Sequence, residues 1–495
     1  MASKSSRFAK RFFNTKVTKD GFKTFVHFVS FVFKNWPQIF LLTILILASA
    51  CSSNPSSASP TPPALDSAAT DSSSPKIIPF FTTENDPNQL AFLQAMIAKY
   101  QSQHPNVEVD VTIAWPAERG RRLLSALASG SDLGIFEVEP TLMPQWVESG
   151  YLLPLNDVVT NIGPSDFVEG SLYQQNGQVY AVPYAVSVYG LWVRKDLLER
   201  AGLPIPATYD EVLHAARVLT QNSMYGIALP AGQNIATVNY FSIFLWQNGG
   251  DYFSCDGEVI FGQPQSLEAV KRWAELAQYA PPGYSTWSYR EQIDAFLNQR
   301  VAMSMYGGRL GVQLEETHPE LSDKVTVIFP PFGDEKVTLG VWNRFAIAAG
   351  TKNQQEAKDF LQWLISDDQL LEYDLTVPGH MIPLLKSTRQ KALTSPDSFT
   401  TKHPDWIRSF YDWYDYANHP AMNMGSVANG QFKRSDMIPP WAWEVFGTPG
   451  IVDTMVHNIS TGGDVESEWQ DAVAAMNQTV TAWKSAHPDW QGMCK

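Results

Sequence analysis

Short apolar runs alternate with amphipathic stretches in the first part of the folded chain. Residues 76–81 (KIIPFF) predict a strand, and residues 90–100 carry apolar side chains at the spacing of one helix face. Residues 107–113 (VEVDVTI) alternate strictly and predict a second strand. A helix over 121–129 and a strand over 133–138 (LGIFEV) follow. This order predicts right-handed crossovers and a mostly parallel sheet.

The same alternation returns later in the chain. Strands are expected at 189–193, 301–305 and 325–329, and helices at 209–220, 266–279, 289–298 and 354–366. Thr208 and Glu211 form a capping-box pattern before the first of these helices. An apolar run over 339–349 leads into a turn, and the part after Leu384 is mainly helical. The pattern predicts two α/β units with helical additions.

The N-terminal segment is cationic and then apolar. Residues 1–36 hold eight Lys or Arg and one acid, and residues 39–50 (IFLLTILILASA) carry no charge. This run is short for a membrane span of ~20 residues but suits a secretory signal. Ala48, Ser49 and Ala50 precede Cys51, which resembles a lipoprotein signal with Cys51 lipidated. The alternative is a plain signal peptide or an N-terminal anchor helix with Cys51 incidental.

Residues 52–75 are a tether by composition, because 20 of these 24 are Ser, Pro, Ala or Thr. We therefore expect a signal over 1–50 and a lipidation cysteine with its tether over 51–75. The chain after Cys51 has 28 basic and 49 acidic residues, a formal charge of −21, against −14 for the whole sequence. Such a charge argues against nucleic acid as a partner.

Motifs for metal or cofactor chemistry are missing from the sequence. There is no C-x-x-C, H-E-x-x-H, G-x-S-x-G, P-loop or G-x-G-x-x-G pattern. We expect neither a metal nor a cofactor. Cys255 and Cys494 could pair in an exported protein, but their spacing does not show that they do.

Five stretches in order carry a family resemblance. They are IAKYQSQHPNVEVDV (97–111), the run 123–155 that ends in GYLLPL, the run 179–220 that begins VYAVPYAVSVYGLWVRKDLLERAGLP, FLNQRVAMSMYGG (296–308) and FAIAAGTKNQQEAKDFLQWLISDD (345–368). Together they resemble the extracellular solute-binding proteins of ABC importers, in the sugar-binding, maltose-binding-protein-like group. The chain departs from the family pattern at Ser131-Asp132-Leu133, where Pro-Asp is usual, and at Val193-Arg194, where Tyr-Asn is common.

The resemblance implies an α/β fold of two lobes, a type II periplasmic-binding-protein-like fold with a mixed, mostly parallel sheet in each lobe and a multi-segment hinge. Lobe 1 would be 76–183 plus 343–378, and lobe 2 would be 184–342 plus 379–495. The crossings would fall near 183–188, 340–344 and 377–383. Ligand would bind between the lobes, and the closed form would dock on the transmembrane subunits of an ABC permease. We expect a monomer.

Sugars present an apolar face that an aromatic ring can cover and hydroxyls that carboxylates, amides and guanidinium groups can bind. The candidates are such residues just after predicted strands or at the crossings: Glu84, Trp115, Glu137, Glu139, Tyr184, Ser187, Tyr240, Trp287, Tyr306, Arg309, Trp342, Asn343, His380 and Trp441.

Each candidate also has an ordinary structural interpretation. Glu139 could cap the helix after Pro140, Trp115 could cover a lobe surface, and Tyr184 could pack at the hinge. Trp342 could belong to the core, and Arg309 could be a surface charge.

Two aromatic groups are interpreted by helical spacing. Trp441 and Trp443 point to different sides of a helix, so at most one should face ligand. Trp406, Phe410, Trp413 and Tyr414 recur every three to four residues, which indicates core packing.

Three functions remain open. The first is non-catalytic capture of a mono- to oligosaccharide for import. The second is the same fold in another role, either as a receptor subunit for signalling or as a binder of a non-sugar solute such as a polyol, phosphodiester or peptide. The third is an exported glycoside hydrolase, which needs two carboxylates ~5–9.5 Å apart. We expect Glu137 and Glu139 to point to opposite faces of their strand and so to make a poor pair.

Overall fold

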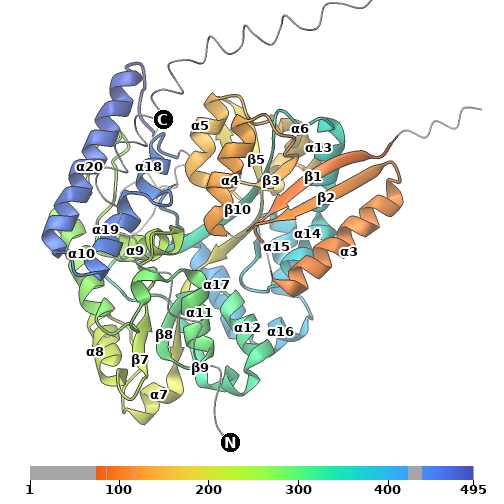
Figure 1. Ribbon diagram of the computed structural model, residues 1–495. Coiled ribbons are helices and arrows are strands. Elements are labelled where there is room, and N and C mark those ends of the chain that lie inside the picture. Colours follow the sequence, from red (N-terminus) through yellow and green to blue (C-terminus); the bar gives the residue numbers. More distant parts are fainter. Residues whose placement is uncertain (1–73, 85, 115, 422–437, 494–495) are drawn as a thin grey trace, which may run out of the picture. The chain divides into compact units, whose positions relative to one another are not determined.

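The computed structural model describes residues 74–84, 86–114, 116–421 and 438–493. These described residues pack as one unit (Figure 1). The proposed signal, Cys51, most of the tether, Trp115 and Cys494 lie outside the described residues, so those expectations are unchanged.

A large mixed sheet forms the first half of this unit. Its strands run in the order β11-β5-β10-β3-β1-β2, with β4 and β12 paired at the side. The bounds are β1 (Lys76–Thr82), β2 (Val107–Ile113), β3 (Ile135–Glu137), β4 (Tyr173–Gln175), β5 (Gln178–Val188), β10 (Thr338–Ile347), β11 (Ile382–Pro383) and β12 (Ala417–Asn418).

The parallel pairs of this sheet are β1 with β2, β1 with β3 and β10 with β12. Strand β10 runs antiparallel to both β3 and β5. The expected mixed sheet is confirmed, but its mostly parallel character is not. The reason is topological: β10 returns from the second half and enters between β3 and β5 in the reverse direction.

A smaller sheet forms the second half, in the order β7-β8-β6-β9. Its strands are β6 (Gly190–Arg194), β7 (Tyr225–Ala228), β8 (Val301–Tyr306) and β9 (Val325–Ile328). Strand β6 is antiparallel to β8 and β9, and β7 is parallel to β8. The chain passes from one sheet to the other through Tyr189, between β5 and β6, and returns at the start of β10.

Helices cover both sheets. Those beside the large sheet are α3 (Pro87–Gln103), α4 (Pro116–Ala128), η1 (Pro140–Leu142), α5 (Met143–Glu148), α6 (Asn156–Ile162), η2 (Pro164–Asp166), α13 (Gln354–Leu364), α14 (Asp367–Asp374) and α15 (Lys386–Leu393). The remaining helices before residue 330 are α7 (Lys195–Arg200), α8 (Tyr209–Leu219), α9 (Ile235–Gln247), α10 (Pro264–Ala277), η3 (Tyr284–Thr286), α11 (Tyr289–Leu297), α12 (Arg309–Thr317) and η4 (Pro319–Lys324).

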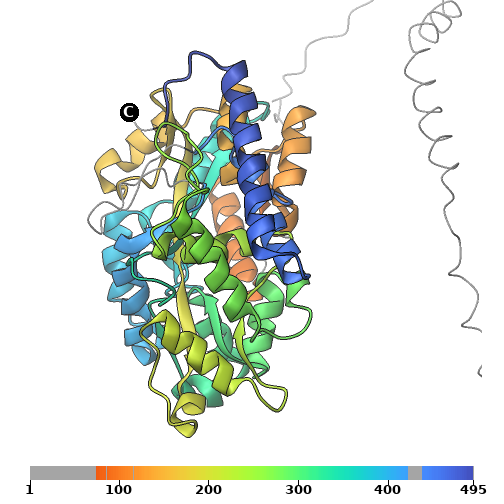
Figure 2. The ribbon, with the colours of Figure 1, turned by 90° about the vertical axis from the view of Figure 1, so that its left-hand side faces the viewer.

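The C-terminal part adds α16 (Ser398–Lys402), α17 (Pro404–Asp412), η5 (Trp413–Tyr416), α18 (Ala442–Phe446), α19 (Ile451–Ser460) and α20 (Val465–Ala486). The long helix α20 lies over α19 and α10 of the second half (Figures 1 and 2). Within the described residues, no helix is both long and apolar enough to cross a bilayer.

Local sequence explains where several helices begin. The Asp86 carboxylate accepts hydrogen bonds from the backbone N–H groups of Asn88 and Gln89 and so caps α3. The Thr208 hydroxyl accepts from the Glu211 N–H at the start of α8, as expected. The Glu211 carboxylate binds the N–H of Ala207, one residue earlier than a capping box requires.

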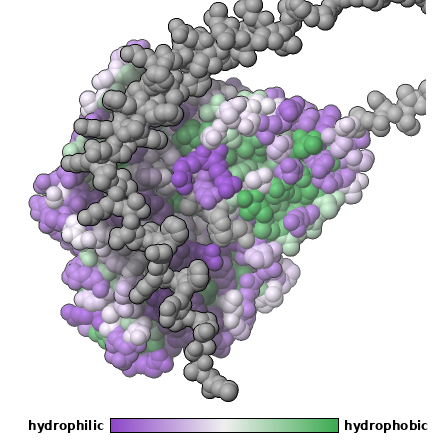
Figure 3. All heavy atoms as spheres, viewed as in Figure 1, coloured by the Kyte–Doolittle hydropathy of each residue, from purple (hydrophilic) through white to green (hydrophobic). Residues whose placement is uncertain are grey.

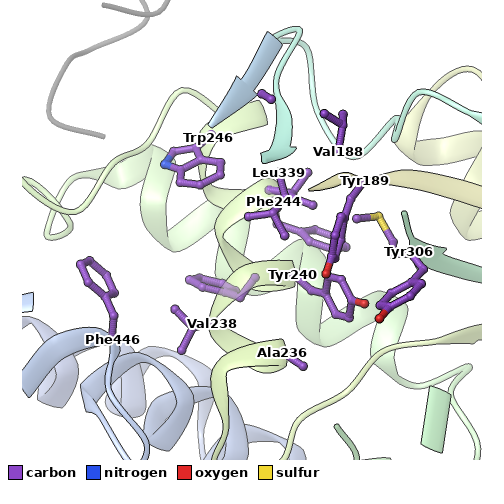
Figure 4. Packing of buried hydrophobic residues seen from close by; sticks show 14 of the residues in the cluster. Val188, Tyr189, Ala236, Val238, Tyr240, Phe244, Trp246, Tyr306, Leu339 and Phe446 are labelled. Carbon is purple, nitrogen blue, oxygen red and sulfur yellow. The ribbon is translucent and has the colours of Figure 1, made fainter. Parts of the chain in front are cut away.

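Helix α9 is the buried centre of the second half. Its residues from Ala236 to Gln247 are all buried, so it lacks the one-sided apolar pattern that would have predicted it. Figure 4 shows side chains of α9 packed between Tyr189 and Tyr306 on one side and Phe446 on the other. The expected core stripe is present in Trp406, Phe410 and Tyr414, which are all buried.

The outer edge of the large sheet is β2, within the described residues. The face shown in Figure 3 gathers apolar side chains over β1 and β2, where Ile77 and Ile113 are 47% and 43% exposed. Glu108 and Asp110 project from β2 as exposed charges. Charges on an edge strand oppose pairing with another chain.

Candidate functional site

A cavity of about 420 Å³ is lined by residues from both halves. The first half contributes the loops after β1 and β3, the start of α4, and strands β5 and β10. The second half contributes the starts of α9, α11 and α12 and the end of β8. Polar residues at the carboxyl ends of strands are the usual lining of such a site in α/β proteins.

Glu137 is fixed at the end of β3. Its carboxylate accepts hydrogen bonds from the hydroxyls of Thr82 and Thr83 and from the Thr83 N–H at 3.0 Å. All three donors come from the end of β1, the neighbouring parallel strand. The strand pairing therefore positions a buried carboxylate at the cavity.

Arg119 brings Glu137 and Glu139 together. Its Nη2 lies 3.2 Å from Glu139 Oε2, and its Nη1 lies 3.9 Å from Glu137 Oε2. Glu139 also accepts a hydrogen bond from the hydroxyl of Thr141. The expectation that the two carboxylates would point to opposite faces was wrong, because residues two apart in an extended chain share a side. Both line the cavity, and both face the same guanidinium.

Arg309 joins the two halves across the cavity. Its Nη2 donates to Glu84 Oε2 at 2.8 Å and to Gln89 Oε1 at 3.2 Å, and its Nη1 lies 3.7 Å from Asp86 Oδ2. Burial acts to lower the pKa of Arg309, but its neighbours, Glu84 first and then Tyr306 and Asp86, together raise it. Burial raises the pKa of Glu84, with Arg309 acting in the opposite direction and Glu137 adding to the rise.

Aromatic rings form much of the remaining wall. Tyr184 of β5 stacks on Phe345 at a centroid distance of 4.3 Å. Tyr306 and His380 stack at 5.5 Å with 21° between their planes. Tyr189 lies beside Tyr306, and Figure 4 shows that the rings of these two and of Tyr240 lie near one another. The cavity thus offers flat apolar surfaces beside charged groups.

Three buried polar atoms of lining residues have no hydrogen-bond partner within the described structure: Asn239 Oδ1, Gln313 Oε1 and His380 Nδ1. The Asn239 amide donates to the Tyr289 hydroxyl at 2.6 Å. Because an unpaired buried polar atom costs about 1–3 kcal/mol, such atoms suit a bound molecule rich in hydroxyl groups.

Two histidines border the cavity in the neutral form. His380 Nε2 lies 3.3 Å from the Ser187 hydroxyl, and burial, followed by the charge of Arg309, lowers its pKa well below the usual value. Burial lowers the pKa of His419 to about 3, and Arg344 and Arg119 act in the same direction.

Ten of the sequence candidates line this cavity: Glu84, Glu137, Glu139, Tyr184, Ser187, Tyr306, Arg309, Trp342, Asn343 and His380. They reach it from six separate stretches of the chain, which the two sheets bring together.

Three described candidates do not line it. Tyr240 is buried beside Tyr189 and Tyr289, one layer behind the wall. Trp287 is buried against the loop that holds Asn234, whose amide donates to the Trp287 carbonyl. Trp441 lies in an aromatic cluster with Phe253, Trp483 and Trp490.

Sequence reasoning gave no role to Arg119, Tyr289, Gln313 or His419, which also line the cavity. The first three lie in the first or second turn of a helix, and position near a helix start was an available signal. His419 follows the two-residue strand β12, and no local sequence pattern predicts that this histidine lies at the cavity.

No cluster of three or more His, Cys, Asp or Glu suited to a metal ion occurs in the described part of the chain. What the cavity offers chemically is recognition: two guanidinium–carboxylate groups, amides with a free acceptor, and aromatic faces. Carboxylates paired with arginine can bind neighbouring hydroxyl groups while remaining positioned by the protein.

Comparison with known proteins agrees with this architecture. A family model described as bacterial extracellular solute-binding protein matches residues 85–370. YcjN of Escherichia coli (strain K12), provisionally named an ABC transporter periplasmic-binding protein, is 24% identical over 81% of this chain and 92% of its own length.

Solved structures show the same fold. A maltose-bound MalE3 from T. maritima aligns with a TM-score of 0.67 and 18% identity, covering 82% of this chain and all of that one. An ABC transporter solute-binding protein from Agrobacterium vitis S4 with bound D-mannitol aligns with a TM-score of 0.66 and 19% identity, covering 83% and 99%. These likenesses confirm the expected type II, maltose-binding-protein-like fold.

Proposed function

Because the chain belongs to the bacterial extracellular solute-binding proteins, the binding components of ABC transporters, we propose that it captures a carbohydrate in the cavity between its two sheets and delivers it to a permease. The lobes would be 76–183 plus 343–378 and 184–342 plus 379–495. Strands β5 and β10 of the large sheet cross these boundaries and β11 lies just beyond the third, so these strands would form the hinge. Cys51, once lipidated, would hold the protein on the outer face of the membrane.

One observation carries the choice of carbohydrate. Tyr184, Tyr306 and Trp342 line the same cavity as the Arg119 and Arg309 ion pairs and the unpaired Asn239 carbonyl. Aromatic faces suit the C–H face of a sugar ring, and the polar groups suit its hydroxyls. Charges of both signs lie within the cavity, which disfavours strongly anionic or cationic ligands.

The nearest alternative is a polyol, which shares the hydroxyls but lacks the ring. D-Mannitol in a protein of the same fold supports keeping this alternative. A glycoside hydrolase is less favoured, because Glu137 and Glu139 are bound by one arginine rather than placed on either side of a substrate.

A thermal-shift screen over sugars, polyols and short peptides tests the proposal. A ligand present at a hundred times its Kd stabilises the protein by about 2.7 kcal/mol and raises its melting temperature. We expect sugars to raise it and to change Trp fluorescence. A shift caused by polyols or peptides but by no sugar would replace the carbohydrate assignment.

A further inference from the structure

A second contact joins the two halves, on the side of the cavity near Glu139. Helix α18 is fixed to the second half by Trp441 and Phe446, whose rings lie 5.5 Å and 6.2 Å from Phe253. Helix α18 also contacts η1 of the first half, directly after Glu139. This short helix therefore connects the halves at a site separate from Arg309.

The indole of Trp443 makes this contact against a glycine. A Cβ atom at Gly120 would lie 2.8 Å from Trp443 Cζ3 and 2.9 Å from Trp443 Cη2. The same atom would lie 3.4 Å from Cγ of Glu139, a residue of the cavity wall. The ring thus rests on the backbone of α4 beside the cavity, at a distance that a side chain at position 120 would prevent.

Gly120 lies in the interior of α4, where glycine is less favourable for the helix than alanine. On the second half, Gly447 lies against the backbone and the same six-membered ring of Trp443: a Cβ there would lie 2.3 Å from the Trp443 carbonyl oxygen and 2.8 Å from Cδ2 and Cε3. With glycine at both 120 and 447, the Trp443 indole can approach both backbones closely, and this close packing holds the ring in one position.

We propose that Trp443 and Gly120 form a closing contact that stops the halves at a fixed separation and limits the ligand to one or two sugar rings, or a polyol of similar size. This rests on the proposed function. The Trp443–Gly120 contact adjoins the cavity wall at Glu139, whereas Arg309 and Glu84 are themselves part of that wall. Its volume of about 420 Å³ is near the lower end of the ~300–1,000 Å³ usual for ligand pockets.

The test combines distance and affinity measurements on the full chain. Spin labels at exposed Lys99 and Glu268, one on each half, report the separation. Wild type, Gly120→Ala, Trp443→Ala and Gly350→Ala are measured alone and with saturating glucose, maltose, maltotriose or mannitol. Gly350→Ala is the matched control, because a Cβ there meets no atom within 4 Å.

We expect Gly120→Ala to lose the shortest label distance seen in wild type and to bind the preferred probe about tenfold more weakly, as overpacking of 1–3 kcal/mol implies. Trp443→Ala should reduce the ratio of the affinity for maltose to the affinity for maltotriose. The closing contact is overturned if Gly120→Ala shows the same label-to-label distances as Gly350→Ala. It is also overturned if no probe shortens the label-to-label distance of wild type relative to the protein alone. The size limit is overturned if wild type binds maltotriose as tightly as maltose.

The two proposals fail in different ways. If no sugar or polyol shifts the melting temperature, the proposed function fails, while the label distances of the free proteins still decide whether the contact forms.

Discussion

Arg309 of α12 and Glu84 after β1 form a buried ion pair with 2.8 Å between Nη2 and Oε2, although 225 positions separate them in the sequence. Each residue belongs to a different half of the molecule. The pair therefore forms only when the two halves are together. Removing it should lower the free energy of unfolding.

Replacing Arg309 with Met should lower the free energy of unfolding by about 3 kcal/mol, because Glu84 would remain buried without its cation. Denaturant unfolding measures this. Arg122→Met, which breaks the exposed pair with Glu118, is the control and should change stability by less than about 0.5 kcal/mol. An equal change in the free energy of unfolding for the two variants would show that the Arg309–Glu84 pair stabilises the protein no more than an exposed ion pair does.

Asn239→Ala should weaken binding of the sugar found in the thermal-shift screen by about tenfold, through loss of an unpaired acceptor at the cavity. Asn248→Ala removes an amide at the opposite end of α9, which donates to the carbonyls of Phe244 and Phe332 outside the cavity, and should leave affinity unchanged. Calorimetric titration of both variants makes the comparison. Unchanged affinity in Asn239→Ala would remove this residue from the binding site.

Acid should destabilise the protein through His419. In the folded chain its pKa is about 3, so below pH ~6.5 the unfolded chain binds a proton that the folded chain does not. Wild type should lose stability relative to His419→Asn by about 1.4 kcal/mol per pH unit between pH 6 and 4. Unfolding at several pH values measures the difference, with the exposed His214→Asn as control. Parallel curves for wild type and His419→Asn would contradict a buried neutral histidine.

Cys255 is disulfide-bonded. The Met493 N–H donates to the Cys255 carbonyl at 2.9 Å, so we expect the next residue, Cys494, to be the partner. Non-reducing peptide mapping should recover the two cysteines in one linked pair, and Cys255→Ser should cost about 2–5 kcal/mol. Recovery of Cys255 linked to Cys51 instead would also argue against lipidation of Cys51.

Membrane attachment should depend on Cys51. Cys51→Ala expressed in a bacterial host should move from the membrane fraction to the soluble fraction and lose incorporation of a labelled fatty acid. Persistence of the variant at the membrane would favour an N-terminal anchor helix.

Elements with a clear period were predicted well from the sequence. Strand β2 coincides with the predicted 107–113, because strict alternation at a sheet edge leaves one face exposed. Helix α9 was not predicted, since a helix buried on all sides has no polar face. Strand β5 was also missed, and Pro183 within it obscures the pattern.

The site was predictable where a residue ends a strand or comes shortly after one, as Glu137 and Glu84 do. It was not predictable where tertiary packing decides between wall and core. Trp441 and Trp443 differ by two positions, yet one is buried in an aromatic cluster and the other rests on Gly120. Only the position of α18 between the halves separates their roles.

The central place of β10 has a consequence for how the protein folds. Strand β10 pairs with both β3 and β5, so these two strands keep unpaired edges until residue 347 has joined them. Pairings between segments more than 150 residues apart form slowly and expose strand edges meanwhile. During synthesis, which begins at the N-terminus, the large sheet of the first half cannot be completed until β10 has been made. By then most of the second half has also been synthesised. Truncation before β10 should therefore yield an aggregating chain rather than a smaller stable domain.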